Sequence, residues 1–275
     1  MKRNIIIGAI FIVGLGIFLY PIIAHMFSTT VHKSTISDYR NIVDDLTDEE
    51  LEQAKRQVAD HNGQLKGTDL NFVDPFNASD DKKSNSEGNK SYYDALNIGP
   101  SIGSVNIPKI DIELPIYHGT SDKVLSRGAG HLENSSLPSS EMGVHSVITA
   151  HRGLPSTKMF RELDKLQVGD VFEVEVLDEK LYYEVNDIQI VKPHETSWLQ
   201  IDDDKNEVTL LTCDPYMINT DRLLVTGHII PAPPVEAIDI KVAHDWVTIA
   251  VILTVVVAIT TGIYKLIKHK EIVKV

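Results

Sequence analysis

Two uncharged apolar blocks, one near each end of the 275-residue chain, constrain its fold more than any other feature. The first covers residues 5–24 and the second covers 247–264. Each is close to the ~20 apolar residues that a helix needs to cross a bilayer. Neither has the polar stripe of a surface helix, which argues against a buried hairpin. The sequence therefore predicts a transmembrane helix at each end.

Basic residues outside the two blocks predict the orientation of the chain. These residues are Lys2 and Arg3 before the first block, and Lys265, Lys268, Lys270 and Lys274 after the second. Lys and Arg are enriched on the cytoplasmic side of membrane helices, so both termini are expected in the cytoplasm and about 28–245 outside the cell. The first block could instead be a cleaved signal peptide, but it is long for one and lacks a clear cleavage site.

The formal net charge of −13 comes mostly from the segment between the blocks. A nucleic-acid-binding protein needs a basic face, so this class is excluded. Within the segment, Thr47 and Glu50 have capping-box spacing and predict a helix over about 47–60, ended by Asn62-Gly63. The polar stretch 77–91 predicts a mobile loop.

From residue 102 to residue 230 the chain is rich in short β-type runs separated by turn residues, which predicts a β-barrel or β-sandwich. The predicted strands are Gly103–Ile110, Ile112–Tyr117, His145–Ala150, Val171–Leu177, Leu181–Val191, Val208–Thr212 and Leu223–Ile230. One helix is predicted at Thr157–Leu166, where apolar residues recur at helical spacing.

Cys213 is the single cysteine, so it cannot form a disulfide within the chain. It is either an inert core residue or a nucleophile, and a nucleophile requires a base or a cation nearby. Among eleven histidines, His151 stands out because it follows an apolar β-type run, as catalytic residues on rigid scaffolds often do. Arg222 follows Cys213 by nine residues, so a returning loop could bring its guanidinium to the thiol as an oxyanion donor. The alternative is a surface ion pair of Arg222 with Asp214 or Asp221.

Several motifs carry a resemblance to a known family. The run Thr-Leu-Leu-Thr-Cys at 209–213, followed by Arg222, resembles the signature of the sortases, which are cysteine transpeptidases of Gram-positive cell surfaces. The segment 147–155, Val-Ile-Thr-Ala-His-Arg-Gly-Leu-Pro, resembles their catalytic histidine segment. Further segments resemble the pilus-assembling branch, class C; they lie at 114–120, 128–133, 158–165 and 215–220.

This resemblance implies a mainly β fold, a closed barrel of about eight strands with a few short helices. It implies Cys213 as nucleophile, His151 as general acid and base, and Arg222 as the group that stabilises the oxyanion or substrate. The implied reaction cleaves an LPXTG-like signal between Thr and Gly and transfers the acyl group to a lysine of a pilin subunit. Asp74-Pro75-Phe76 resembles the lid of class C members, although Asp-Pro alone would indicate an ordinary turn.

The predicted organisation has six parts. They are an N-terminal anchor at 1–27, a helical region with the lid at 28–100, the catalytic barrel at 101–230, a Pro-rich linker at 231–246, a membrane helix at 247–267 and a basic tail at 268–275. Three positions depart from the family pattern, since Asp214 stands where Thr is common, Met217 where Gly is common, and Asp221 where His is frequent. An inward Asp214 carboxylate would disfavour a thiolate, so we expect it to point outward or to bond turn amides.

No cofactor or metal is expected, because no ligand spacing of a known metal motif is present. The acidic run 202–204 is interpreted as a solvated turn rather than a Ca²⁺ site. Two alternatives to the transpeptidase remain. One is a membrane-anchored cysteine protease that gives the acyl group to water, and the other is a non-enzymatic scaffold with Cys213 buried in the core.

Overall fold

The computed structural model describes residues 2–67, 74–76, 90–154 and 157–233, together with the single residues 254 and 262. Apart from residues 254 and 262, the predicted second membrane helix lies outside these residues, as do the basic tail and nearly all of the predicted polar loop. The elements, in chain order, are α1 (Lys2–Asp44), α2 (Asp48–Leu65), α3 (Lys90–Asp94), β1 (Gly103–Ile107), the 3-10 turn η1 (Pro108–Ile110), β2 (Ile112–His118), α4 (Asp122–Leu125), β3 (Ala129–His131), β4 (Val144–Thr149), the 3-10 turn η2 (Leu163–Lys165), β5 (Val171–Val176), β6 (Glu179–Val191), β7 (Asn206–Asp214) and β8 (Asp221–Ile230).

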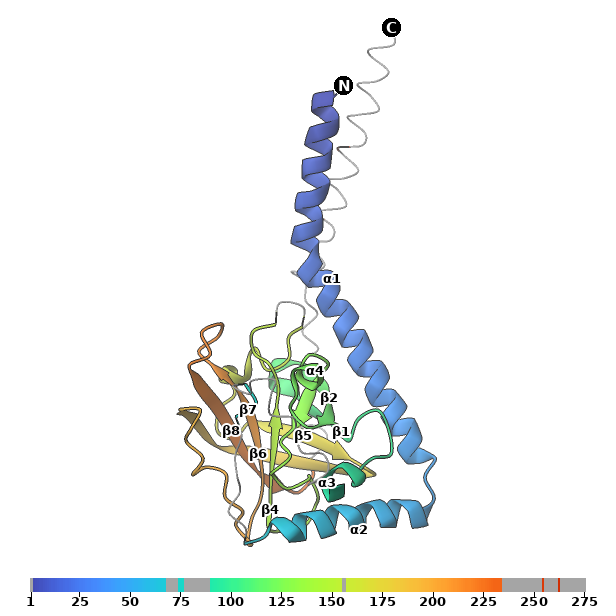
Figure 1. The fold of residues 1–275 in the computed structure, drawn as a ribbon, viewed down its shortest axis with the longest axis vertical. Helices are drawn as coiled ribbons and strands as arrows, with labels where there is room; N and C mark the ends of the chain where they lie inside the picture. The colour runs from blue at the N-terminus through green and yellow to red at the C-terminus, as the bar shows by residue number, and fades with distance from the viewer. Residues whose placement is uncertain are drawn as a thin grey trace. The chain divides into compact units, whose positions relative to one another are not determined.

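The strands form a closed barrel in the order β1-β2-β3-β4-β7-β8-β6-β5 (Figure 1). Two neighbouring pairs, β2 with β3 and β4 with β7, are parallel, and the other pairs are antiparallel. The predicted barrel of about eight strands is therefore confirmed. The sequence missed β3, which has three residues with a glycine at its centre and so has no apolar alternation.

The barrel interior is filled by apolar side chains at alternate strand positions. Phe172 of β5 and Tyr183 of β6 stack with ring centroids 5.4 Å apart. Gly227 of β8 makes room for this pair, because a Cβ atom there would lie 2.7 Å from Cε1 of Phe172. Position 227 therefore requires a glycine, because the stacked rings of Phe172 and Tyr183 lie directly against the backbone of β8 there.

Helix α2 begins as predicted and ends later than predicted. The Thr47 hydroxyl accepts a hydrogen bond from the Glu50 amide, and the Glu50 carboxylate accepts one from the Thr47 amide, which completes the capping box. The expected end at Asn62-Gly63 is wrong, because α2 continues to Leu65. The side chain of Asn62 makes two hydrogen bonds with the backbone of Leu137, at 2.9 and 2.8 Å. Because the Asn62 side chain bonds to this distant segment, it does not cap the end of the helix, and α2 continues past it.

The helix predicted at Thr157–Leu166 is also wrong. The segment consists of turns followed by η2, and Met159 has a φ of 37°, in the left-handed region. The guanidinium of Arg161 donates to the carbonyls of Leu154 and Thr157 at 2.6 and 2.9 Å. The bond to Thr157 satisfies a carbonyl that a helix would have paired with its own amide, and the bond to Leu154 holds the segment that precedes it.

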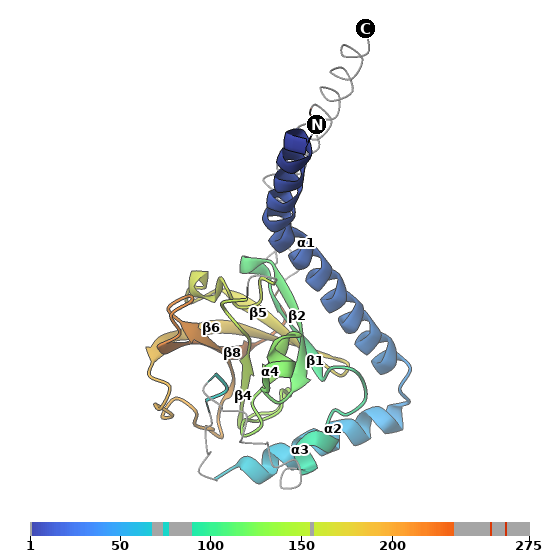
Figure 2. The same cartoon turned by 45° about the horizontal axis from the view of Figure 1, so that its top comes forward.

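Helix α1 extends from an apolar exposed part to a part that packs on the barrel (Figures 1 and 2). Within the described part of the chain, α1 is the one helix long and apolar enough to cross a membrane. Its C-terminal part buries Ile36, Tyr39 and Val43. Arg40 donates to Glu175 of β5 at 2.8 Å and to Glu113 of β2 at 3.0 Å. Packing and ion pairs therefore join α1 to the outside of the barrel.

Replacing Tyr39 with Phe is expected to lower the free energy of unfolding by about 2–4 kcal/mol. The hydroxyl donates to the Ile102 carbonyl at 3.0 Å and accepts from the Leu177 amide at 2.8 Å, so both buried backbone groups would lose their partner. Urea unfolding of the detergent-solubilised chain measures the effect. Tyr20→Phe is the matched control, because Tyr20 lies on the exposed part of the same helix. A change equal to that of the control would contradict the prediction.

Candidate active site

Cys213 and Arg222 are direct neighbours across two strands. Cys213 lies near the end of β7, Arg222 lies near the start of β8, and their Cα atoms are partners in the antiparallel ladder. The connecting loop therefore returns the chain to the same barrel end, as the spacing predicted. Both side chains are buried, with 5% of Cys213 and 2% of Arg222 exposed.

His151 reaches the same end of the barrel from β4. Because β4 runs parallel to β7, with Thr149 opposite Leu211, the two strands end together. The Ala150 amide donates to the Leu211 carbonyl at 3.3 Å, and the Thr212 hydroxyl donates to the Ala150 carbonyl at 2.7 Å. Three adjacent strands, β4, β7 and β8, thus bring the predicted histidine, cysteine and arginine together.

The predicted lid residues lie against two of these side chains. The Arg222 guanidinium makes a two-pronged ion pair with Asp74, with Nε–Oδ1 and Nη2–Oδ2 distances of 2.8 and 2.6 Å. The Phe76 ring lies with its centroid 5.2 Å from Cζ of Arg222 and 5.6 Å from the ring of His151. Asp74 and Phe76 therefore occupy the space beside the arginine and the histidine.

The thiol and the imidazole are both held in their neutral forms. Burial raises the pKa of Cys213 to about 11; Arg222 lowers it, Asp74 raises it and Arg152 lowers it. Burial also lowers the pKa of His151, against a smaller raising effect of Asp122. Among the hydrogen bonds of the described residues, none joins the Cys213 thiol to His151. This arrangement is that of a resting site rather than of a formed thiolate–imidazolium pair.

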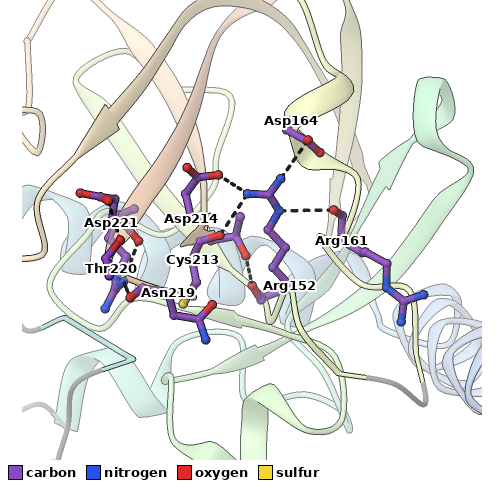
Figure 3. A network of polar contacts seen from close by, with 11 residues as sticks. Arg152, Arg161, Asp164, Cys213, Asp214, Asn219, Thr220 and Asp221 are labelled. Carbon is purple, nitrogen blue, oxygen red and sulfur yellow. Dashed lines mark hydrogen bonds and ion pairs between the residues drawn. The ribbon is translucent and has the colours of Figure 1, made fainter. Parts of the chain in front are cut away.

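Arg152 is a buried residue to which the sequence assigned no role. Its side chain is 5% exposed, and its guanidinium forms ion pairs with Asp164, at 2.9 Å, and with Asp214 (Figure 3). As expected, the Asp214 carboxylate is directed away from the thiol, but its partner is Arg152 and not the turn amides. An arginine directly after the candidate histidine was the one sequence feature that could have indicated this network. Asp221, the third departure, pairs with Lys192.

The acidic run 202–204 forms a turn in which the Asp204 amide donates to the Asp202 carboxylate at 3.1 Å. Lys205 approaches the same carboxylate at 3.5 Å. The described residues contain no group of three or more His, Cys, Asp or Glu side chains that could hold a metal ion.

A buried thiol with a histidine and an arginine at one end of a barrel is the side-chain set of a cysteine enzyme that transfers acyl groups. A profile of the family described as the sortase domain matches residues 105–230. Sortase D of Bacillus subtilis (strain 168) is 30% identical over 152 residues, which cover 55% of this chain and 74% of that protein. Sortase A of Bacillus anthracis is 26% identical over 131 residues, 47% of this chain and 60% of that protein.

Solved structures give the same result over more of the chain. Sortase C1 of Streptococcus agalactiae is 36% identical with a TM-score of 0.68, and the match covers 75% of this chain and 100% of that one. Sortase C of Streptococcus pneumoniae is 40% identical with a TM-score of 0.64, and the match covers 73% of this chain and 100% of that one. The chain belongs to the sortase family and is a cysteine transpeptidase, which confirms the resemblance found in the sequence, including its class C character.

Proposed function

We propose that this protein is a membrane-anchored sortase that joins pilin subunits. In this proposal it cleaves an LPXTG-like signal between Thr and Gly and transfers the acyl group to a lysine amine of the next subunit. The observation that carries the proposal is the meeting of His151, Cys213 and Arg222 at one barrel end in a chain similar to sortase C enzymes. Two of those structures are described in terms of a pilus island and of pilin substrate specificity.

The proposed mechanism has two half-reactions. The Cys213 thiolate attacks the Thr carbonyl, Arg222 stabilises the oxyanion, and His151 gives a proton to the departing glycine amine as the Thr–Gly bond breaks. The resulting thioester is then attacked by the lysine amine, which gives its proton back to His151. The new amide bond releases the thiolate, so the two halves give ping-pong kinetics.

Asp74 and Phe76 act in this proposal as a lid that must leave before catalysis. The Asp74 carboxylate uses two donors of Arg222 that an oxyanion would need. The Phe76 ring lies beside both Arg222 and His151. Pro75 connects the two residues and limits the backbone conformations between them.

Helix α1 supports the proposed location. Its apolar part is long enough to cross a membrane, and its C-terminal part packs on the barrel. We infer that the barrel is held at the outer face of the cell membrane, with the N-terminus in the cytoplasm.

Mass spectrometry of the detergent-solubilised chain, incubated with an LPXTG-type peptide with and without an amine acceptor, tests the function. The expected result is a thioacyl adduct on Cys213 and a product that requires the acceptor. Cys213→Ala should lose both, because no other thiol exists in the chain. Cleavage that does not depend on the acceptor would indicate a hydrolase instead. Transfer retained by Cys213→Ala would contradict the mechanism.

A further inference from the structure

The guanidinium of Arg152 connects two segments of the candidate site. Arg152 directly follows His151 in the chain. Its Nη1 lies 3.4 Å from the backbone carbonyl oxygen of Cys213, and the same nitrogen pairs with the carboxylate of Asp214. One side chain from the histidine segment thus holds both the backbone of the nucleophile and the residue after it.

Two further contacts fix the guanidinium from the other side. Its Nη2 pairs with Asp164 at 2.9 Å, and its Nε donates to the carbonyl of Arg161 at 3.3 Å. Arg152 therefore has a partner for each of its three nitrogens and almost no freedom to reorient. A buried cation with two carboxylate partners is a costly way to fill space, because well-packed apolar residues do so at least as well. Such a network instead fixes geometry.

The arginine acts on Cys213 from the side opposite the reacting sulfur. Successive side chains of a strand point to opposite faces, so the Asp214 carboxylate and the Cys213 thiol lie on different sides of β7. Figure 3 shows the sulfur of Cys213 directed away from the guanidinium of Arg152. Arg152 therefore does not compete with Arg222 for the oxyanion. Arg152 affects Cys213 in two ways: its hydrogen bond holds the backbone of β7 in place, and its positive charge acts on the thiol.

We propose that Arg152 is a positioning residue, which fixes Cys213 relative to His151 while Asp214 balances its charge behind the thiol. The proposal rests on the proposed function, because it assigns Cys213 and His151 to the reaction. The charge of Arg152 lowers the pKa of Cys213. Asp214 partly neutralises that charge, so the two ends of the ion pair have opposite effects on the thiol.

The test compares Arg152→Gln, Arg152→Lys and Asp214→Asn in the full chain, each carrying Asp74→Ala and Phe76→Ala so that the lid is absent. We expect Arg152→Gln to lower kcat for acyl transfer by roughly 10–100-fold while KM changes less than about twofold, because a small misplacement of reacting groups slows chemistry. Arg152→Lys should recover part of this loss, since it keeps the charge but not the planar fork. Arg40→Gln is the matched control, because Arg40 also pairs with two carboxylates but outside the site.

The pH profile of iodoacetamide labelling supplies a readout that needs no peptide substrate. Arg152→Gln should raise the apparent thiol pKa and Asp214→Asn should lower it. A purely structural role would make both variants shift in the same direction, or not at all, because both break one ion pair. That result, or a kcat of Arg152→Gln within threefold of its parent per folded molecule, would overturn the proposal. If the parent lacks acyl transfer altogether, the proposed function fails while the labelling profile still decides the role of Arg152.

Discussion

Replacing both Asp74 and Phe76 with alanine is expected to speed the labelling of Cys213 by iodoacetamide near neutral pH by roughly 10²-fold. Burial is the main reason that the pKa of Cys213 lies at about 11, and the Asp74 carboxylate raises it further. Removing the ring and the carboxylate admits water to the thiol. Arg222 then lowers the pKa of Cys213 without the opposing effect of Asp74. If the pKa of Cys213 returns toward the ordinary thiol value of ~8.5, the fraction of thiolate near neutral pH rises by roughly 10²-fold, and the labelling rate rises with it.

The labelling is specific without further engineering, because Cys213 is the one cysteine of the chain. Rates measured across a pH series separate a change in pKa from a change in access. Asp178→Ala is a suitable control, because it removes a carboxylate that pairs with Lys55 outside the site. If the double variant labels at the rate of the unchanged chain, Asp74 and Phe76 do not restrict the thiol and the lid proposal fails.

The strands that carry the site were predictable because their residues are β-formers in continuous runs. The predicted Val208–Thr212 and Leu223–Ile230 lie inside β7 and β8, and each observed strand extends two residues beyond the predicted run at its site-proximal end. These additional residues include Cys213 and Arg222 themselves. Polar residues at strand ends break the apolar pattern even though the backbone ladder continues through them.

The partners of Arg152 could not be predicted from the sequence. Asp214 is distant from it in the chain, and the two meet only because β4 and β7 are parallel neighbours in the barrel. Composition predicts strands, but it does not predict which strands pair or in which order. The same reason makes the pairing of Asp74 with Arg222 inaccessible to local reasoning, and only the family resemblance indicated it.

The two failed helix predictions have a common cause. Asn62 and the segment around Arg161 both contain polar groups that local rules assign to helix ends or helix surfaces. In the fold these groups bond to backbone atoms that are distant in sequence or outside a helix. A tertiary hydrogen bond therefore allows the helix to continue past Asn62, whereas local hydrogen bonds of Arg161 to Leu154 and Thr157 stabilise turns in place of the predicted helix.

Acidification from about pH 7 to pH 4.5 is expected to lower the free energy of unfolding by about 2.5 kcal/mol through His131 alone. His131 is fully buried and its Nε2 donates to the Ser136 carbonyl at 2.9 Å. The Tyr92 hydroxyl donates to the backbone carbonyl of His131 at 3.0 Å and lies 3.1 Å from Nδ1 of the ring. Burial lowers the pKa of His131 to about 3, so the folded chain keeps the neutral ring in this range. The unfolded chain binds the proton near ~6.5, so the stability is fully present above that pH and is lost as pH falls toward 3.

Two neighbouring histidines strengthen the effect. Burial lowers the pKa of both His61 in α2 and His118 in β2. The rings of His61 and His118 lie 5.6 and 5.0 Å from the ring of Tyr92 in α3, so the cluster joins both helices to the barrel. Because α2 and α3 flank the lid segment in the chain, acid should loosen the helices on either side of the lid before it unfolds the barrel.

Urea unfolding of the full chain at several pH values between about 7 and 4.5 measures this dependence. His131→Gln cannot bind the proton, so its free energy of unfolding should fall less steeply with decreasing pH than that of the unchanged chain. The difference between the two slopes should be ~1.4 kcal/mol per pH unit. His194→Gln provides the comparison, because His194 is an exposed residue in the segment between β6 and β7. Equal slopes for the unchanged chain and His131→Gln would show that the buried ring does not stay neutral, and the expected acid lability would then have another origin.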